Sequence, residues 1–142
     1  EFRRVLFRSR SSRRGSAMLE SSFIFIVFFS LLIGAFDFGQ FLFIHQALVE
    51  RARWAARWGM AYGGTNDQIR NMVVYGQTST GSTGYLGLET NMVTVTSNNA
   101  NTWNWNINVL LSNYPYKMLS PYIAGSYTGP NILVSVPLGM YN

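Results

Sequence analysis

The 142-residue sequence contains no cysteine, a single histidine and few charged residues, which make up 12% of the chain. Without cysteine, neither disulfide bonds nor thiolate metal sites are available, and one histidine alone does not make a zinc site. No phosphate-binding glycine loop and no nucleophile elbow is present either. The sequence therefore argues against an enzyme and predicts neither a metal nor another cofactor. We expect His45 to be a packed or interfacial side chain.

The excess of positive charge is confined to the first fourteen residues. This segment holds six of the eleven basic residues and one of the six acidic residues, and the other five of each kind cancel. A basic chain can indicate a nucleic-acid partner, but this cluster stands directly before an apolar segment. The positive-inside rule then predicts a cytoplasmic N-terminus and an extracytoplasmic C-terminal part, with no nucleic acid as partner.

The start of the chain, residues 1–9, resembles the translation of a sequencing adapter in its run from Arg3 to Ser9. A natural basic leader is the alternative interpretation. A segment of this kind is excluded from reasoning about the fold. The charge argument holds in both cases, because Arg10, Arg13 and Arg14 still precede the apolar segment.

A long apolar run follows the basic cluster. Between residues 21 and 44 the only charged residue is Asp37, and the run is rich in Phe, Ile and Leu. About 20 apolar residues cross a bilayer core of roughly 30 Å, so residues 17–36 are long enough for one membrane span. Glu20 and Asp37 then fall near its two ends, away from the costly bilayer centre.

The helical pattern continues beyond the span and becomes amphipathic. At 100° per residue, one arc of about 80° carries mainly small and apolar residues, namely Phe41, His45, Leu48, Ala52, Ala55 and Gly59. The opposite side carries Gln46, Glu50, Arg53 and Arg57. We therefore predict one helix over residues 16–62, stopped by Gly63 and Gly64. This continuation argues against a secretory signal peptide, which would also have a poor cleavage site near Phe36.

The small side chains of that arc allow another segment to approach closely. The partner is either a neighbouring subunit of a filament or the chain's own C-terminal domain, and both uses are compatible with the sequence.

Residues 63–142 are predicted to form an extracytoplasmic head. A short helix is expected over residues 66–75, with Thr65 or Asn66 as its N-cap, and a polar loop over residues 76–84. A period of two then replaces the helical period, over residues 92–96, 103–109 and 132–138. The predicted fold class is α+β: a long N-terminal transmembrane and amphipathic helix, followed by a short helix and a small antiparallel β-sheet.

The start of the long helix resembles the leader of a type IV prepilin. Arg13 and Arg14 are followed by Gly15, four uncharged residues and then Glu20. The resemblance implies a leader over residues 1–15 that prepilin peptidase cuts between Gly15 and Ser16. It also implies that Glu20 supports assembly by neutralising the new N-terminal amine of an adjacent subunit. A helix-start glutamate favoured by the helix dipole is the alternative.

Nearly all of the chain after the basic cluster is similar to the TadE-like pilins of tight-adherence (Flp) systems. The resemblance rests on Arg14-Gly15 with Glu20, on Phe38-Gly39-Gln40, and on the small-residue-rich segment 52–57. The family commonly has an arginine where this chain has Gln40, so no role of that arginine is carried over. The resemblance implies a single-pass inner-membrane subunit, in particular a minor pilin. The implied partners are prepilin peptidase, other pilins, the inner-membrane assembly platform and the lipid bilayer.

The tryptophans leave a choice between two functions. Trp103 and Trp105 alternate with asparagines, and we expect them in the core of the head. If they were exposed instead, they would suit a membrane-anchored carbohydrate-binding adhesin, which is the alternative function; a membrane-bound extracytoplasmic enzyme is a third interpretation. Trp54 and Trp58 lie at the edge of the polar side of the long helix. Together with Asp37 they are the candidates for inter-subunit contacts.

Overall fold

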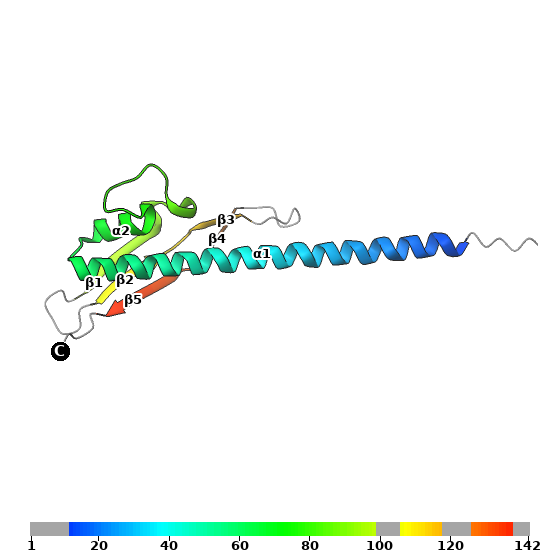
Figure 1. Ribbon diagram of the computed structural model, residues 1–142, viewed down its shortest axis with the longest axis horizontal. Helices are drawn as coiled ribbons and strands as arrows, with labels where there is room; N and C mark the ends of the chain where they lie inside the picture. The colour runs from blue at the N-terminus through cyan, green and yellow to red at the C-terminus, as the bar shows by residue number, and fades with distance from the viewer. Residues whose placement is uncertain (1–11, 99–105, 118–125, 138–142) are drawn as a thin grey trace, which may run out of the picture.

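The computed structural model describes residues 12–98, 106–117 and 126–137 (Figure 1). Two helices are followed by two short 3₁₀ turns and five strands. They are α1 (Ser12–Tyr62), α2 (Asn66–Tyr75), η1 (Tyr85–Gly87), η2 (Thr90–Met92), β1 (Val93–Asn98), β2 (Asn106–Leu111), β3 (Pro115–Lys117), β4 (Ser126–Thr128) and β5 (Ile132–Pro137). The α+β class predicted from the sequence is confirmed.

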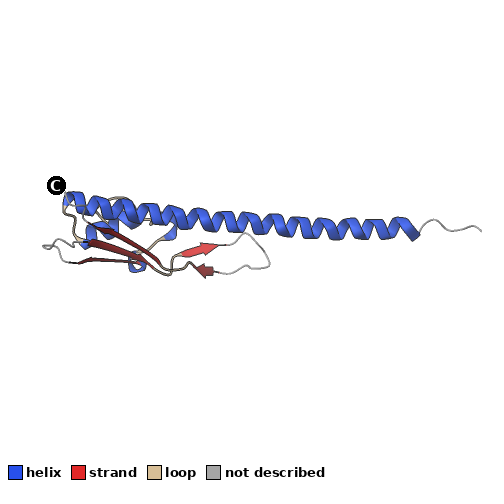
Figure 2. Cartoon of the chain, turned by 90° about the horizontal axis from the view of Figure 1, so that it is seen from below, coloured by secondary structure: helices blue, strands red, loops and turns tan. Residues whose placement is uncertain are grey.

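Helix α1 is the dominant element, with 51 residues and a length of about 77 Å at 1.5 Å per residue. It begins at Ser12, four residues earlier than expected, so Gly15 and Ser16 are helical. It ends where the glycine pair predicts, because Gly63 adopts a left-handed φ of 65° that residues with a Cβ disfavour. Figures 1 and 2 show that the remaining elements cover only the C-terminal part of this helix.

The amphipathic pattern of α1 is confirmed. Leu48, Ala52, Ala55 and Gly59 are buried, whereas the residues expected on the opposite side, Gln46, Glu50, Arg53 and Arg57, are exposed. The small residues bring α2 close to α1, because a Cβ on Gly59 would overlap the side chain of Ile69. On this side of the helix, the small residues therefore pack against the chain's own head.

Helix α2 occupies the predicted range and uses the predicted cap. The Thr65 hydroxyl accepts a hydrogen bond from the Gln68 N–H at 3.3 Å, and the Gln68 side chain accepts one from the Thr65 N–H at 2.9 Å. This reciprocal pair satisfies two backbone donors that the first turn leaves free. At the other end Gly76 has φ of 77° and donates to Met72 O, the usual glycine stop.

Strands β1, β2 and β5 form an antiparallel sheet with β2 in the centre. Ile107 and Val109 are buried, and the intervening Asn108 is partly exposed, as alternation predicts. The expected strand over residues 103–109 is described from Asn106 onward, and Trp103 and Trp105 lie outside the described residues.

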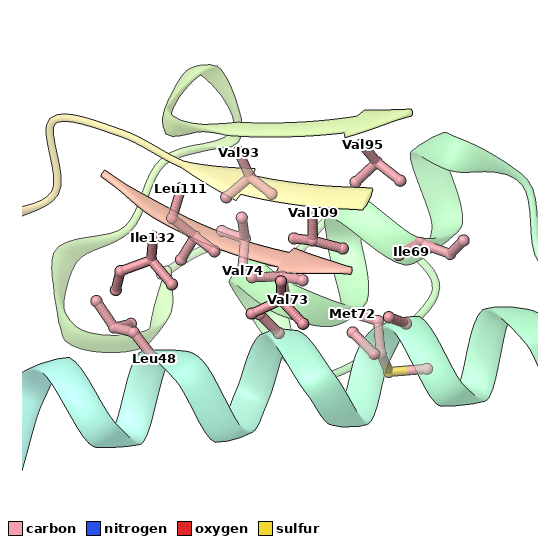
Figure 3. Close-up of a cluster of buried hydrophobic side chains, with 14 of the residues drawn as sticks. Leu48, Ile69, Met72, Val73, Val74, Val93, Val95, Val109, Leu111 and Ile132 are labelled. Atoms are coloured by element: carbon pink, nitrogen blue, oxygen red, sulfur yellow. The ribbon is translucent and has the colours of Figure 1, made fainter. Parts of the chain in front are cut away.

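The buried face of the sheet packs against α1 and α2, which together make a two-layer head (Figure 3). Directly paired valines, Val95, Val109 and Val134, cross the middle of this face. On α1, Leu48 contributes to the same cluster (Figure 3). Burial of this apolar surface is the main force that holds the head on the helix.

A second, two-stranded sheet was not expected. β3 and β4 pair antiparallel, with Tyr116 opposite Tyr127, and proline is tolerated at the first position of β3 because it needs no ladder donor there. Figures 1 and 2 show this hairpin beside α1, displaced from the main sheet toward the N-terminal part of the helix. The ring of Tyr116 contacts that of Phe41 on α1, with centroids 5.4 Å apart.

Candidate functional site

The N-terminal part of α1 exposes large apolar side chains from Met18 to Phe43. Residues 23–29 are all exposed. Seven consecutive residues make almost two turns, so the apolar surface surrounds the helix there. A helix that is apolar on all sides is either buried in a large core or placed in a membrane. In the described part of the chain, α1 is the one helix with the length and composition to cross a membrane.

The serines within this segment have their hydroxyl groups satisfied inside the helix. Ser21, Ser22 and Ser30 each donate to the carbonyl oxygen four residues earlier, at 2.9, 2.8 and 2.7 Å. In hydrocarbon an unpaired hydroxyl is costly, because no water is present to bond it. The serines are therefore compatible with lipid around this part of α1.

Gly15, Ser16 and Glu20 are all exposed at the start of this segment. Apart from its chain neighbours and the backbone of its own helix, no described atom lies within 4 Å of the position that a Cβ on Gly15 would take. Ser16 and Glu20 are four residues apart in a helix, so they lie on the same face. Among the described side chains, none forms an ion pair with Glu20. The surroundings of Gly15 are thus uncrowded, and the Glu20 carboxylate is exposed.

Asp37 is in a different environment. It is buried in the single chain, with 9% of its surface exposed. Phe41 and His45 follow at four-residue intervals, so all three lie on the side of α1 that faces the head. This position favours a role within the chain over the expected contact with another subunit.

The two tryptophans of α1 also differ. Trp54 is 52% exposed. Trp58 is half-buried; its ring packs against Tyr62 at 5.8 Å, and a Cβ on Gly64 would meet it. Trp58 therefore covers the end of the helix, whereas Trp54 presents an aromatic surface to the outside.

Tyr114 and His45 join the head to α1 where the helix leaves the apolar segment. Tyr114 is buried, with 1% of its surface exposed, and its hydroxyl lies 3.2 Å from Nδ1 of His45. Burial, with a smaller contribution from Tyr116, raises the pKa of Tyr114, so the phenol is neutral at physiological pH. The expectation that His45 is packed is confirmed, because its ring also lies on that of Phe41 at 6.1 Å.

Arg51 was not singled out by the sequence pattern, yet it joins three elements. Its Nε donates to Val73 O in the last turn of α2 at 2.6 Å, and its guanidinium carbon lies 4.2 Å from the ring centroid of Tyr85 in η1. A cation is favoured at a helix C-terminus. Burial lowers the pKa of Arg51 and Tyr85 opposes that shift. A signal was present in the sequence: at 100° per residue Arg51 falls about 60° from Leu48, at the border of the buried arc.

We expect Arg51→Met to lower the free energy of unfolding of the head by roughly 2 to 3 kcal/mol. It removes a charge-assisted hydrogen bond and a cation–π contact, and leaves Val73 O without its donor. Arg53→Met is the matched control, because that arginine forms an exposed pair with Glu50 and such pairs contribute little. Chemical denaturation in detergent measures both, and equal losses would contradict the assigned role of Arg51.

A groove of about 390 Å³ lies between α1 and the edge strand β5, lined by His45, Val49 and Arg53 of the helix and by residues 131–135. No carboxylate lines it, so it offers no pair of acids for acid–base chemistry. Within residues 12–98, 106–117 and 126–137, no three His, Cys, Asp or Glu side chains are grouped so as to hold a metal ion.

The comparisons with known proteins concern the helix. No curated protein and no solved structure is significantly similar to the chain. The model of the family described as TadE-like protein matches residues 15–57, from the glycine before the apolar segment to the exposed Arg57. This family is a pilus-component family that is not known for enzymes, and it points to a protein associated with the Tad pilus. The resemblance to the TadE-like proteins that the sequence predicts is thus confirmed over residues 15–57.

Proposed function

We propose that the chain is an assembly subunit of a tight-adherence (Flp-type) pilus system, in particular a minor pilin, anchored in the bacterial inner membrane by α1. One observation carries the proposal. The N-terminal part of α1 is apolar and exposed on all sides, whereas its C-terminal part is amphipathic and carries a small head. The TadE-like match spans this transition. The N-terminus is cytoplasmic and the head extracytoplasmic, as the basic cluster favours.

Processing by prepilin peptidase is the first step that we propose. The peptide bond after Gly15 follows two arginines and precedes the apolar segment. Gly15 and Ser16 on either side of this bond are exposed, and none of the described side chains crowds the Cβ position of Gly15. Cleavage would remove the basic leader and create an amine on Ser16.

Glu20 is the proposed assembly residue. It is exposed near the end of the span, where a carboxylate without a partner is unfavourable in a medium of low dielectric constant. The Ser16 amine of an adjacent subunit would neutralise it. The assembly platform and the other pilins of the same system are the proposed partners, and Trp54 supplies an exposed aromatic anchor for one of them.

Substitution of Glu20 tests the proposal. We expect Glu20→Gln to leave membrane insertion and processing intact and to reduce recovery of the subunit in cross-linked or sheared assemblies at least tenfold, the factor that corresponds to about 1.4 kcal/mol of lost pairing. The substitution keeps the size of the side chain and removes its charge.

Glu50→Gln is the matched control, because Glu50 lies on the same helix, is exposed and pairs with Arg53. We expect this variant to assemble normally. Normal recovery of Glu20→Gln would reject the role assigned to Glu20. The adhesin alternative gains no support from the described residues, since Trp103 and Trp105 lie outside them.

A further inference from the structure

The β3–β4 hairpin contacts α1 at Phe41. The Phe41–Tyr116 contact at 5.4 Å is extended by Tyr116 and Tyr127, whose centroids are 5.9 Å apart. All three rings are half-buried, so each keeps part of its surface exposed. The hairpin, which lies beside α1 (Figure 1), thus carries a pair of partly exposed tyrosines.

The level of this contact coincides with the edge of the membrane span. Phe41 follows the end of the span, residue 36, by five residues, which is about 7.5 Å at 1.5 Å per residue. The headgroup layer adds roughly 5 to 7.5 Å to each side of the hydrocarbon core, so Phe41 lies at its outer part. Apolar exposure on α1 continues past this level, through Leu42 and Phe43. The exposed apolar surface of α1 therefore extends along the helix as far as the level of the hairpin.

We infer that the β3–β4 hairpin lies in the lipid headgroup layer on the side where α1 leaves the membrane, and that Tyr116 and Tyr127 bind the lipid surface there. Tyrosine suits this layer because its ring is apolar and its hydroxyl is polar. The inference rests on the proposed insertion of α1, and it adds a second membrane contact from a distant part of the sequence.

The position of Asp37 supports the same arrangement. Asp37 precedes Phe41 by one turn on the head-facing side of α1, and it is buried there. Residue 37 stands at the edge of the span, where a carboxylate costs less than at the bilayer centre but still borders the hydrocarbon. Elements of the head that accompany α1 into the interface would keep this carboxylate away from the hydrocarbon.

The absence of cysteine makes the test direct, because single-cysteine variants of the full chain can be spin-labelled without background. Thr128→Cys reports on the hairpin, Ile26→Cys on the middle of the span, and Thr94→Cys on the exposed face of the main sheet. The labelled chains are placed in phosphatidylethanolamine–phosphatidylglycerol vesicles at low protein density. Collision rates with oxygen and with a water-soluble nickel chelate then give the depth of each label.

We expect the label at residue 26 to meet oxygen and exclude nickel, the label at 94 to be fully open to nickel, and the label at 128 to fall between them, with nickel collisions several-fold fewer than at 94. Equal nickel collisions at 128 and 94, with 26 still buried, would overturn the inference and leave the anchor intact. Nickel collisions at 26 would instead reject the proposed membrane anchor. If the label at 128 is protected from nickel only at high protein density, the protection comes from contact with another copy of the chain. That result would also overturn the inference.

Substitution of the ring tests the tyrosines themselves. We expect Tyr127→Ser to move the label at 128 toward water, and Tyr127→Trp, which keeps an interfacial aromatic, to leave it in place. Tyr62→Ser is the matched control, because this exposed tyrosine stands at the far end of α1. If the label at residue 128 stays at the same depth in Tyr127→Ser, the role assigned to Tyr127 is wrong.

Discussion

Gly129→Ala is expected to separate the β3–β4 hairpin from the head. The variant chain should then no longer melt in one cooperative transition. Gly129 is buried and donates its N–H to Tyr114 O at 2.9 Å. A Cβ at this position would overlap the ring of Tyr114. The side chain of Tyr114 is the largest fully buried one of the described residues, so its displacement breaks up packed apolar contacts. Its expulsion costs about 3 to 5 kcal/mol, as for truncation of a buried aromatic, against a total stability of about 5 to 15 kcal/mol.

Thermal unfolding of the detergent-solubilised chain, followed by near-ultraviolet circular dichroism, measures the effect. Gly39→Ala is the matched control, because no heavy atom lies within 4 Å of its Cβ position and alanine is the better helix former. We expect that variant to melt at an unchanged or higher temperature. The cause is checked by combining Gly129→Ala with Tyr114→Ala, since two substitutions that disturb one contact are not additive. A double variant that is destabilised by the full sum would contradict the proposed overlap.

The elements with a regular period were predictable from the sequence. Helix α2 matches its expected range because its start and stop signals, Thr65 with Gln68 and Gly76, are local. The buried side of α1 follows from the spacing of its small residues, since a 3.6-residue period decides which side chains share a face. The central strand was found by alternation, as its described part from Asn106 to Leu111 shows.

The hairpin and the residues that dock it were not predictable in the same way. β3 and β4 have three residues each, which is too short for a period of two to stand out. The contact of Tyr114 with His45 joins positions 69 residues apart, and no local pattern announces it. The burial of Asp37 has the same origin: the sequence places it at a membrane edge, but its cover comes from the fold.

The candidate processing site, in contrast, was predicted from the sequence, and the fold adds little to it. Gly15, Ser16 and Glu20 make few contacts in the fold, so the structure adds to their interpretation mainly their exposure and their helical conformation. Their significance comes from order along the chain, which the TadE-like match at residues 15–57 includes. A short-range motif of this kind is visible in a sequence because it depends on neighbouring residues and not on the fold.

Gly15→Val is expected to leave the leader uncut in cells that carry the matching prepilin peptidase, whereas the parent chain begins at Ser16. Glycine presents no side chain before the scissile bond, and the space around it is open. It also weakens α1 locally, by about 1 kcal/mol relative to alanine, which eases the opening of the helix that a peptidase needs. Valine introduces a branched side chain at the scissile bond and removes part of that weakness.

Mass spectrometry of the membrane-extracted protein identifies the first residue. Gly34→Val is the matched control: it makes the same change in the same helix, at another glycine with open surroundings, and we expect it to be cut normally. An intact leader on the parent chain would reject processing at Gly15, and a cut near Phe36 would indicate a signal peptide instead. If Gly15→Val is uncut and still inserted, it should also fail to assemble, because no Ser16 amine would be available to the Glu20 of a neighbour.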